Sequence, residues 1–311
     1  NGALGGSVSH EFMVPADVGE DVVVKCDTCD YAVNLERAEF IKEVKNPNDK
    51  PAALKEVEAV RGKTMEDGVE LHNLPLWQQI KDVLYVDDQG RFVLAIIRGD
   101  LLVNETKLRN LTQSNELRPA TDQEIIDILH SYPGFISPVG IKDKADKSAK
   151  IIIVADDSLR TIANAYGGSN KRNLDLINVN IDRDYQADLE GDIAQAPQGA
   201  MCSHCQKGKL QFIKAIEFGN IFNLGYTYSK PMNGVFVNAK GEEQKLYMGS
   251  YGIGIGRAMA TIVEKHHDDF GIIWPDSVDP YAVHLVGLDL HDPEIQKTAE
   301  GIYQQLVDSS I

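Results

Sequence analysis

The sequence contains no apolar run long enough to cross a membrane. Its longest apolar runs are residues 92–97 and 151–155, whereas a transmembrane helix needs about 20 residues. No signal peptide is visible and the chain does not begin with methionine, so we interpret its start as a cut within a longer protein. These features predict a cytoplasmic protein without a membrane partner.

Basic residues are outnumbered in this chain. Lysine and arginine total 31 against 47 aspartates and glutamates, which gives a formal net charge of −16. This balance excludes a general basic surface for nucleic acids, so any RNA contact must be a local basic patch or lie on a missing part. The length of 311 residues, 43% of them hydrophobic and 25% charged, suits two or three domains with ordinary cores.

Cysteine is also rare, and its four copies form two Cys-x-x-Cys pairs: Cys26 with Cys29, and Cys202 with Cys205. A disulfide framework is excluded for so large a chain with so few cysteines. Each pair can present two thiolates to one ion, so the two pairs together suit a tetrahedral zinc site. Four unconnected reduced thiols are the alternative.

A glycine-rich stretch, residues 245–257, is the most informative part of the chain. Apolar residues alternate with Gly252, Gly254 and Gly256, which predicts a strand with one face free of side chains. Glycine weakens a strand interior, so we expect a flat group such as a nucleotide base to lie against this face. Arg257 follows, and its guanidinium can stack on a base and hold a phosphate. A glycine-softened core strand is the alternative, and residues 258–265 predict a helix.

Between residues 46 and 187 the pattern predicts a mixed α/β domain. Strands are expected at 83–86, 91–97 and 151–154, and helices at 74–81, 104–111, 159–166 and after a capping box that begins at Thr121.

The stretch 245–257 resembles the third signature motif of class II aminoacyl-tRNA synthetases, in the form carried by bacterial prolyl-tRNA synthetases. Residues 5–12, 217–229 and 266–275 resemble other parts of the same family. The resemblance implies ATP and magnesium as cofactors, with ATP bound at Gly252, Gly254, Gly256 and Arg257. It implies a proline pocket made by His10, Glu11, Phe12, Glu217 and Ser250, with Glu11 and Arg257 as catalytic residues. Asn220 stands where the family more often has histidine.

Residues 98–108 resemble the editing domain that bacterial prolyl-tRNA synthetases carry as an insertion. By this resemblance Lys81 lies at the 3′ end of the tRNA, and Gly134 and Pro138 shape a pocket that admits alanine and excludes proline. Asp156 would hold the free amine of a misattached alanine, and Asp175 stands where the family often has histidine. Such a pocket is needed because a site that accepts proline cannot reject the smaller alanine by fit alone.

The fold class implied is α+β: part of a class II antiparallel catalytic sheet with an inserted mixed α/β editing domain. The expected segments are 1–45 and 188–277 for the catalytic core, 46–187 for editing, and 278–311 for the start of an anticodon-binding domain. In the last segment we expect a strand from residue 279 and a helix at about 293–307.

The expected function is that of a proline–tRNA ligase with hydrolytic editing of alanyl-tRNA, acting on tRNA(Pro), L-proline and ATP. The parent enzyme would be a homodimer. No first or second signature motif is recognisable, so we do not expect this chain alone to aminoacylate tRNA. Two alternatives remain: an editing hydrolase that acts in trans, or a zinc-ribbon module that binds tRNA or protein without catalysis.

Overall fold

The computed structural model describes residues 5–310 and divides the chain into two compact units. The central unit comprises Val22–Ile213, and the terminal unit comprises Asn1–Asp21 with Lys214–Ile311. The predicted insertion 46–187 lies within the central unit, which extends beyond it on both sides. Residues 1–4 of the predicted segment 1–45, and residue 311 of the segment 278–311, lie outside the described residues.

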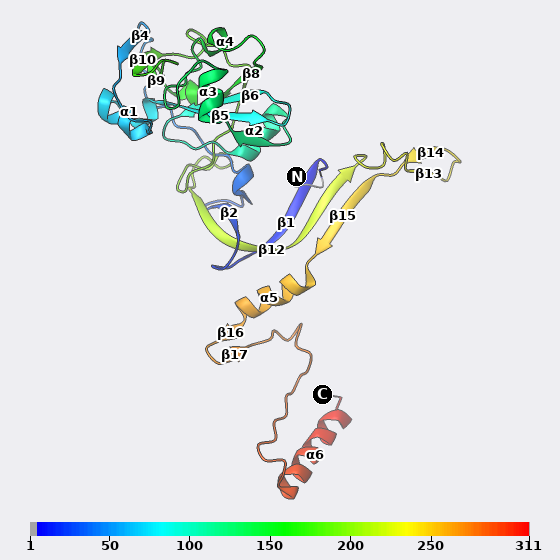
Figure 1. The fold of residues 1–311 in the computed structure, drawn as a ribbon. Helices are drawn as coiled ribbons and strands as arrows, with labels where there is room; N and C mark the ends of the chain where they lie inside the picture. Colours follow the sequence, from blue (N-terminus) through cyan, green and yellow to red (C-terminus); the bar gives the residue numbers. More distant parts are fainter. Residues whose placement is uncertain (1–4, 311) are drawn as a thin grey trace. The chain divides into compact units, whose positions relative to one another are not determined.

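A five-stranded sheet forms the core of the central unit, in the order β11-β8-β6-β5-β7. Figure 1 labels three of its strands, β5, β6 and β8. Its strands are β5 (Ile80–Asp87), β6 (Phe92–Arg98), β7 (Leu117–Pro119), β8 (Ile151–Asp156) and β11 (Leu189–Gly191). β6 pairs with β8 in parallel and with β5 antiparallel. Every residue of β6 is buried, as expected for a central strand that is covered on both faces.

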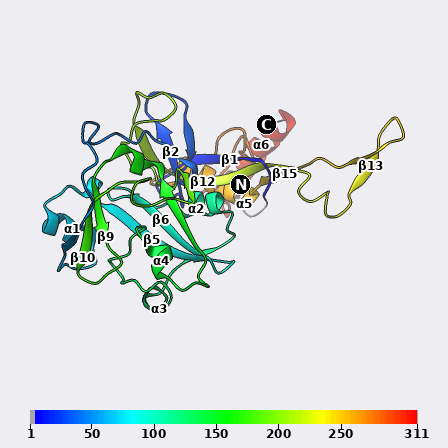
Figure 2. The same cartoon turned by 90° about the horizontal axis from the view of Figure 1, so that it is seen from above.

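A second, antiparallel sheet of the central unit consists of β4 (Lys55–Glu58), β10 (Leu174–Val179) and β9 (Ala165–Gly168). Figure 2 shows β9 and β10 beside β5, and a bridge joins Gln79 to Tyr166. Aliphatic side chains from both sheets, including Leu94, Ile153 and Leu176, share one hydrophobic core. This shared core therefore holds the two sheets together where they meet.

The helices of the central unit are short, and all but the last begin at side-chain caps. They are α1 (Met65–His72), α2 (Glu105–Thr112), α3 (Asp122–Asp127) and α4 (Ile141–Lys144). The predicted capping box at Thr121 is confirmed, since its hydroxyl accepts from the Glu124 N–H. Thr64 and Asp67 form a second capping box at the start of α1. The remaining elements of this unit are β2 (Asp21–Cys26), β3 (Ala32–Asn34) and the 3₁₀ turns η1 (Leu35–Arg37), η2 (Leu76–Gln78) and η3 (Asp157–Thr161).

Two predicted helices of the central unit are wrong. Residues 74–81 form only the turn η2 before β5 begins at Ile80, since Pro75 has extended backbone angles and β-branched residues follow. Residues 159–166 form the turn η3 and the start of β9. Asn164 lies there in the left-handed region, at φ 55°, which ends any helix and turns the chain into a strand.

The terminal unit contains β1 (Val8–Pro15) and β15 (Met248–Ile253), which both pair antiparallel with β12 (Leu210–Gly225) (Figure 1). β12 begins in the central unit and enters the terminal unit at Lys214. The other elements are the hairpin of β13 (Val235–Val237) and β14 (Glu243–Lys245), α5 (Ile255–Lys265), the short pair β16 (His267–Asp268) and β17 (Gly271–Ile272), and α6 (Pro293–Asp308).

The predicted glycine-lined strand is shorter than expected. β15 ends at Ile253 and α5 begins at Ile255, so Gly254 is the N-cap residue and Gly256 lies in the helix. Only Gly252 of the three alternating glycines lies within the strand. In the described part of the chain, no helix has the length and apolar character required to span a membrane.

Gly168 in β9 lies against the loop that contains Gly134. A Cβ atom at Gly168 would lie 2.3 Å from the backbone carbon and oxygen of Phe135, whereas at the neighbouring Gly167 the nearest atom would be 3.6 Å away. We predict that Gly168→Ala lowers the free energy of unfolding by about 1–3 kcal/mol, because backbone must shift to admit the methyl group. Gly167→Ala is the matched control, expected to change it by about 0.5 kcal/mol or less. Equal effects of the two changes in urea unfolding would contradict this packing.

Candidate functional site

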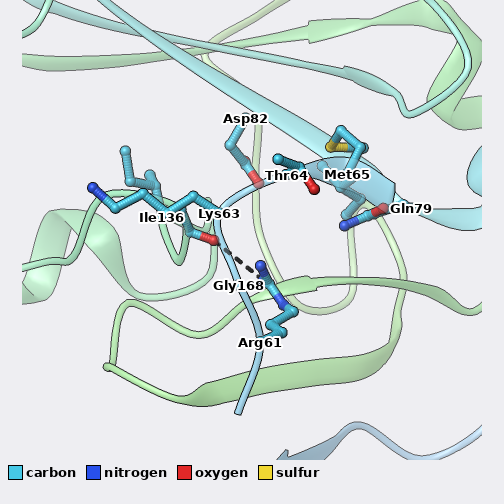
Figure 3. A pocket seen from close by; sticks show the side chains of 10 residues that line it. Arg61, Lys63, Thr64, Met65, Gln79, Asp82, Ile136 and Gly168 are labelled. Carbon is cyan, nitrogen blue, oxygen red and sulfur yellow. Dashed lines mark hydrogen bonds between the residues drawn. The ribbon is translucent and has the colours of Figure 1, made fainter. Parts of the chain in front are cut away.

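The central unit contains a small cavity of about 80 Å³ near the edge where its two sheets meet (Figure 3). Its lining comes from the loop before α1, the start of β5, the loop after α3 and the end of β9: Arg61, Lys63, Thr64, Met65, Gln79, Ile80, Asp82, Gly134, Ile136 and Gly168. This volume holds a few water molecules or one small organic group.

Two side-chain oxygens of this lining are buried without a hydrogen-bond partner among the described residues: Oδ1 of Asp82 and Oε1 of Gln79. Both residues lie at the start of β5, separated by three positions. Burial raises the pKa of Asp82 well above its ordinary value, and the nearby positive charge of Arg61 only partly opposes this. The cavity therefore holds an acidic group whose protonated form is favoured, next to an amide oxygen that can only accept.

Arg61 connects three segments around the cavity. Its Nε and Nη2 donate to the two carboxylate oxygens of Asp175 at 2.7 and 2.6 Å, and Nη2 also donates to the carbonyl oxygen of Gly134 at 3.2 Å. The guanidinium lies 4.4 Å from the centre of the Phe135 ring. His72 Nε2 lies 2.8 Å from the Asp175 carboxylate. This network holds the loop 134–138 and β10 against the segment before α1.

The residues expected at the editing site are only partly brought together. Gly134 lines the cavity. Lys81 lies between Ile80 and Asp82 on β5, but its Nζ donates to the carbonyl oxygen of Leu101 at 2.5 Å. Burial lowers the pKa of Lys81, and Asp100 and Glu66 oppose this shift. Pro138 is buried and is not among the lining residues.

The two expected acidic residues of the editing site do not line this cavity. Asp156 is fully buried, and its carboxylate accepts from the N–H groups of Ser158 and Ile193 and from Lys42 Nζ at 2.8–3.1 Å. Asp175 is also fully buried and is held by Arg61 and His72. The oxygens of both carboxylates already have donors, and the acidic residue that lines the cavity is Asp82.

In the terminal unit, strand alternation divides the expected proline-pocket residues between two faces. Glu11, Asn220 and Gly252 lie directly opposite one another on β1, β12 and β15, so they share a face. The Asn220 amide donates to Glu217 Oε1 at 3.1 Å, and Ser250 lies two residues before Gly252 on the same face. His10 and Phe12 flank Glu11 along the strand and therefore point to the other face. The expectation that they wall one pocket with Glu11 is not met.

Arg257 lies in the first turn of α5. Its Nη1 donates to Glu20 Oε1 at 2.6 Å and to the backbone oxygen of Glu217 at 3.1 Å. A Cβ at Gly252 would lie 2.7 Å from Asn220 Oδ1, so a larger residue there would displace the Asn220 side chain. At Gly256 no atom lies within 4 Å. We expected a strand face free of side chains against which a nucleotide base could lie. This surface is limited to Gly252 and the first turn of α5.

The four cysteines converge in the central unit, with all Sγ atoms within 4.8 Å of one another. Sγ of Cys26 lies 3.7 Å from Sγ of Cys205, and Sγ of Cys29 lies 3.9 Å from Sγ of Cys202. Four sulfurs about 2.3 Å from one zinc ion would be about 3.8 Å apart. The cluster therefore has the dimensions of a tetrahedral Cys₄ site, and Cys26 and Cys202 are buried.

Sequence reasoning missed Arg61, His72, Gln79 and Asp82. A signal for Asp82 was present, because it is an acidic residue directly before the apolar run 83–86 of β5. For Arg61 and His72 no local signal existed, since their partner Asp175 is more than 100 positions away.

The buried pair of Arg61 and Asp175 allows a stability test. Their side chains are 4% and 0% exposed, so we predict that Asp175→Asn lowers the free energy of unfolding by about 3 kcal/mol, because a buried guanidinium loses its countercharge. The exposed pair of Arg160 and Asp182 is the control, and Asp182→Asn should cost about 1 kcal/mol or less. Urea unfolding of both variants measures the difference, and an equally small loss in both would contradict it.

Comparison with known proteins agrees with the sequence resemblance. Residues 60–184 match the family described as the aminoacyl-tRNA editing domain. A proline–tRNA ligase of Halothermothrix orenii is 41% identical over 100% of this chain and 53% of its own length. Those of Dehalococcoides mccartyi and Pelobacter propionicus are 41% and 38% identical over 98% and 100% of this chain. The chain spans about half the length of the curated relatives it matches. It belongs to the prolyl-tRNA synthetase family, in the bacterial form that carries an aminoacyl-tRNA editing domain.

Proposed function

We propose that the central unit hydrolyses alanyl-tRNA(Pro), as the editing part of a protein that ligates proline to tRNA(Pro). The observation that carries this proposal is the cavity of about 80 Å³ inside the segment that matches the editing family. A cavity this small suits the methyl-bearing body of alanine better than the ring of proline. Water attacks the ester carbonyl there, and the 3′-terminal ribose oxygen of the tRNA leaves.

Lys81 is the proposed contact to the tRNA end. It lies one residue from the cavity-lining Asp82 on β5, and its ammonium is half-buried against a backbone oxygen. Exchanging this carbonyl for a phosphate oxygen would give it a charged partner, which forms a stronger hydrogen bond. Gly134 is the proposed flexible point of the pocket loop, with φ at 86°.

For the terminal unit we propose part of the synthetic site, on the sheet face shared by Glu11, Glu217 and Ser250. Glu11 or Glu217 would hold the imino group of proline, since a carboxylate suits a charged secondary amine. Arg257 would exchange Glu20 for a phosphate of ATP, with magnesium balancing the remaining charge. Within this proposal the sheet is part of a class II catalytic domain, and the whole protein is a cytoplasmic homodimer.

The expected segments are kept as proposals, with 1–45 and 188–277 in the catalytic core and 278–311 opening an anticodon-binding domain. α6 was expected near residues 293–307 and spans Pro293–Asp308. The strand expected from residue 279 is absent from the described residues 279–290.

The editing proposal predicts that the 311-residue chain deacylates alanyl-tRNA(Pro) and leaves prolyl-tRNA(Pro) intact. Lys81→Ala should slow this hydrolysis by about tenfold or more, the worth of one charge-assisted hydrogen bond. Lys147→Ala, which changes an exposed lysine of the same unit, is the control and should leave the rate unchanged. Release of radiolabelled alanine from the tRNA is the measurement. Equal hydrolysis of both aminoacyl-tRNAs, or none of either, would rule the function out.

We also propose that the cysteine cluster binds one structural zinc ion. Buried sulfurs at tetrahedral spacing support it, and so do the N–H groups of Thr28 and Gly208, which donate to Cys26 and Cys205 at 3.4 and 3.3 Å. The ion would close a loop of about 175 residues between the two pairs, which are 173 to 179 positions apart. Closing a loop of this length removes much conformational freedom from the unfolded chain. The alternative function, a zinc-ribbon module without catalysis, would use the same zinc site.

The zinc proposal predicts about one equivalent of zinc per chain by elemental analysis after purification without added metal. Cys202→Ser should lower the zinc content below half an equivalent and lower the melting temperature, because three ligands bind zinc less tightly than four. Ser203→Ala, next to the same turn, is the control and should retain the ion. A zinc-free protein with an unchanged melting temperature would refute the site.

A further inference from the structure

Two polar side chains that line the cavity of the central unit each have a buried oxygen atom without a hydrogen-bond partner among the described residues. Asp82 and Gln79 both line the cavity, and Oδ1 of Asp82 and Oε1 of Gln79 are buried without a donor among the described residues. A buried acceptor that receives no hydrogen bond lowers the stability of the fold by about 1–3 kcal/mol. Buried polar atoms in folded proteins nearly always have partners. Two buried acceptors without donors at one cavity therefore point to a missing ligand that donates hydrogen bonds.

The charges around the cavity decide which donor fits. Arg61 is the nearest cation, but its guanidinium is already paired with both oxygens of Asp175. Lys63 is another cation of the lining, and it is 65% exposed and directed to Asp122 at 3.3 Å. Neither cation therefore supplies the charge that Asp82 lacks. A small ligand with a positive charge and several N–H donors would satisfy both oxygens, and a primary ammonium group has these properties.

We propose that Asp82 and Gln79 bind the free α-ammonium group of the aminoacyl ester, so that the pocket selects substrates with an unblocked amine. This inference rests on the proposed editing function and assigns to Asp82 the role first expected for Asp156. Asp156 cannot take it, because Ser158, Ile193 and Lys42 already occupy its carboxylate. When the ammonium enters, Asp82 releases its proton to solvent and forms an ion pair, while Oε1 of Gln79 accepts a second N–H. Asp82 is a binding residue in this scheme, and no bond to it is made or broken.

The placement of Asp82 has a cost in stability. Burial raises its pKa well above the ordinary value, and the charged or titratable groups that act on it are Arg61 and Tyr185. In the unfolded chain the carboxyl ionises above pH of about 4, while in the folded chain it stays protonated to higher pH. Stability is therefore lost as pH rises from about 4 towards the folded pKa. Asp82→Asn removes this loss, so the variant is expected to melt at a higher temperature than wild type at pH 7.

The first test uses two probes that differ only at the amine, L-alaninamide and N-acetyl-L-alaninamide, titrated into the full chain and followed by NMR. We expect wild type to bind L-alaninamide and not the acetylated probe. Asp82→Asn should weaken L-alaninamide binding by about tenfold or more, since it removes a charged hydrogen-bond partner. Asp143→Asn, which changes an exposed acid of the same unit, should bind as wild type does. Equal binding of L-alaninamide by wild type and Asp82→Asn, or none by wild type, overturns the inference.

The second test measures hydrolysis of alanyl-tRNA(Pro) and N-acetyl-alanyl-tRNA(Pro) by the same proteins. Wild type should prefer the free amine, and Asp82→Asn should lose this preference while its melting temperature rises. A variant that loses activity and also melts earlier would assign Asp82 a structural role and contradict the inference. Absence of hydrolysis by wild type contradicts the editing function itself, while the amine-probe titration still decides whether Asp82 binds an ammonium group.

Discussion

The pocket of this protein depends on one buried guanidinium. Arg61 neutralises Asp175 through two short hydrogen bonds, donates to the Gly134 carbonyl and lies over the Phe135 ring. Because a buried charge without a partner is strongly destabilising, this arrangement holds the segment before α1, β10 and the loop 134–138 in one geometry. The positive charge of Arg61 is already paired with the carboxylate of Asp175. As a result the neighbouring Asp82 is left without a countercharge inside a small cavity.

Buried polar groups of the central unit fall into two sets that differ in how well they are satisfied. Asp156 accepts three hydrogen bonds, and Lys107 donates to two backbone oxygens and to Asp192. These groups join the edges of the sheet to the segments that enter and leave the unit. Asp82 and Gln79 form the other set: each lines the cavity and has a buried side-chain oxygen without a hydrogen-bond partner among the described residues. This contrast is the reason why we assign ligand binding to Asp82 and Gln79.

Local patterns predicted the elements that depend on neighbouring residues. The capping box at Thr121, the helix near residues 104–111, the strands around residues 83–97 and the helix near 293–307 were all found. Prediction failed for residues 159–166, where Tyr166 is wholly buried between two sheets and tertiary packing outweighs helix propensity. The family resemblance assigned the free amine to Asp156, and sequence alone could not show that its oxygens already accept hydrogen bonds from Ser158, Ile193 and Lys42.

The family, the mixed α/β character and the two Cys-x-x-Cys pairs could be identified from sequence alone, since they depend on residue types at fixed spacing along the chain. The carboxylate that lines the cavity could not be identified from sequence alone. Arg61 and Asp175 are 114 positions apart, and Cys26 and Cys205 are 179 apart. Only the folded chain brings such residues within bonding distance. The availability of a side chain to a ligand depends on whether those distant partners already satisfy it, and that is a property of the tertiary structure.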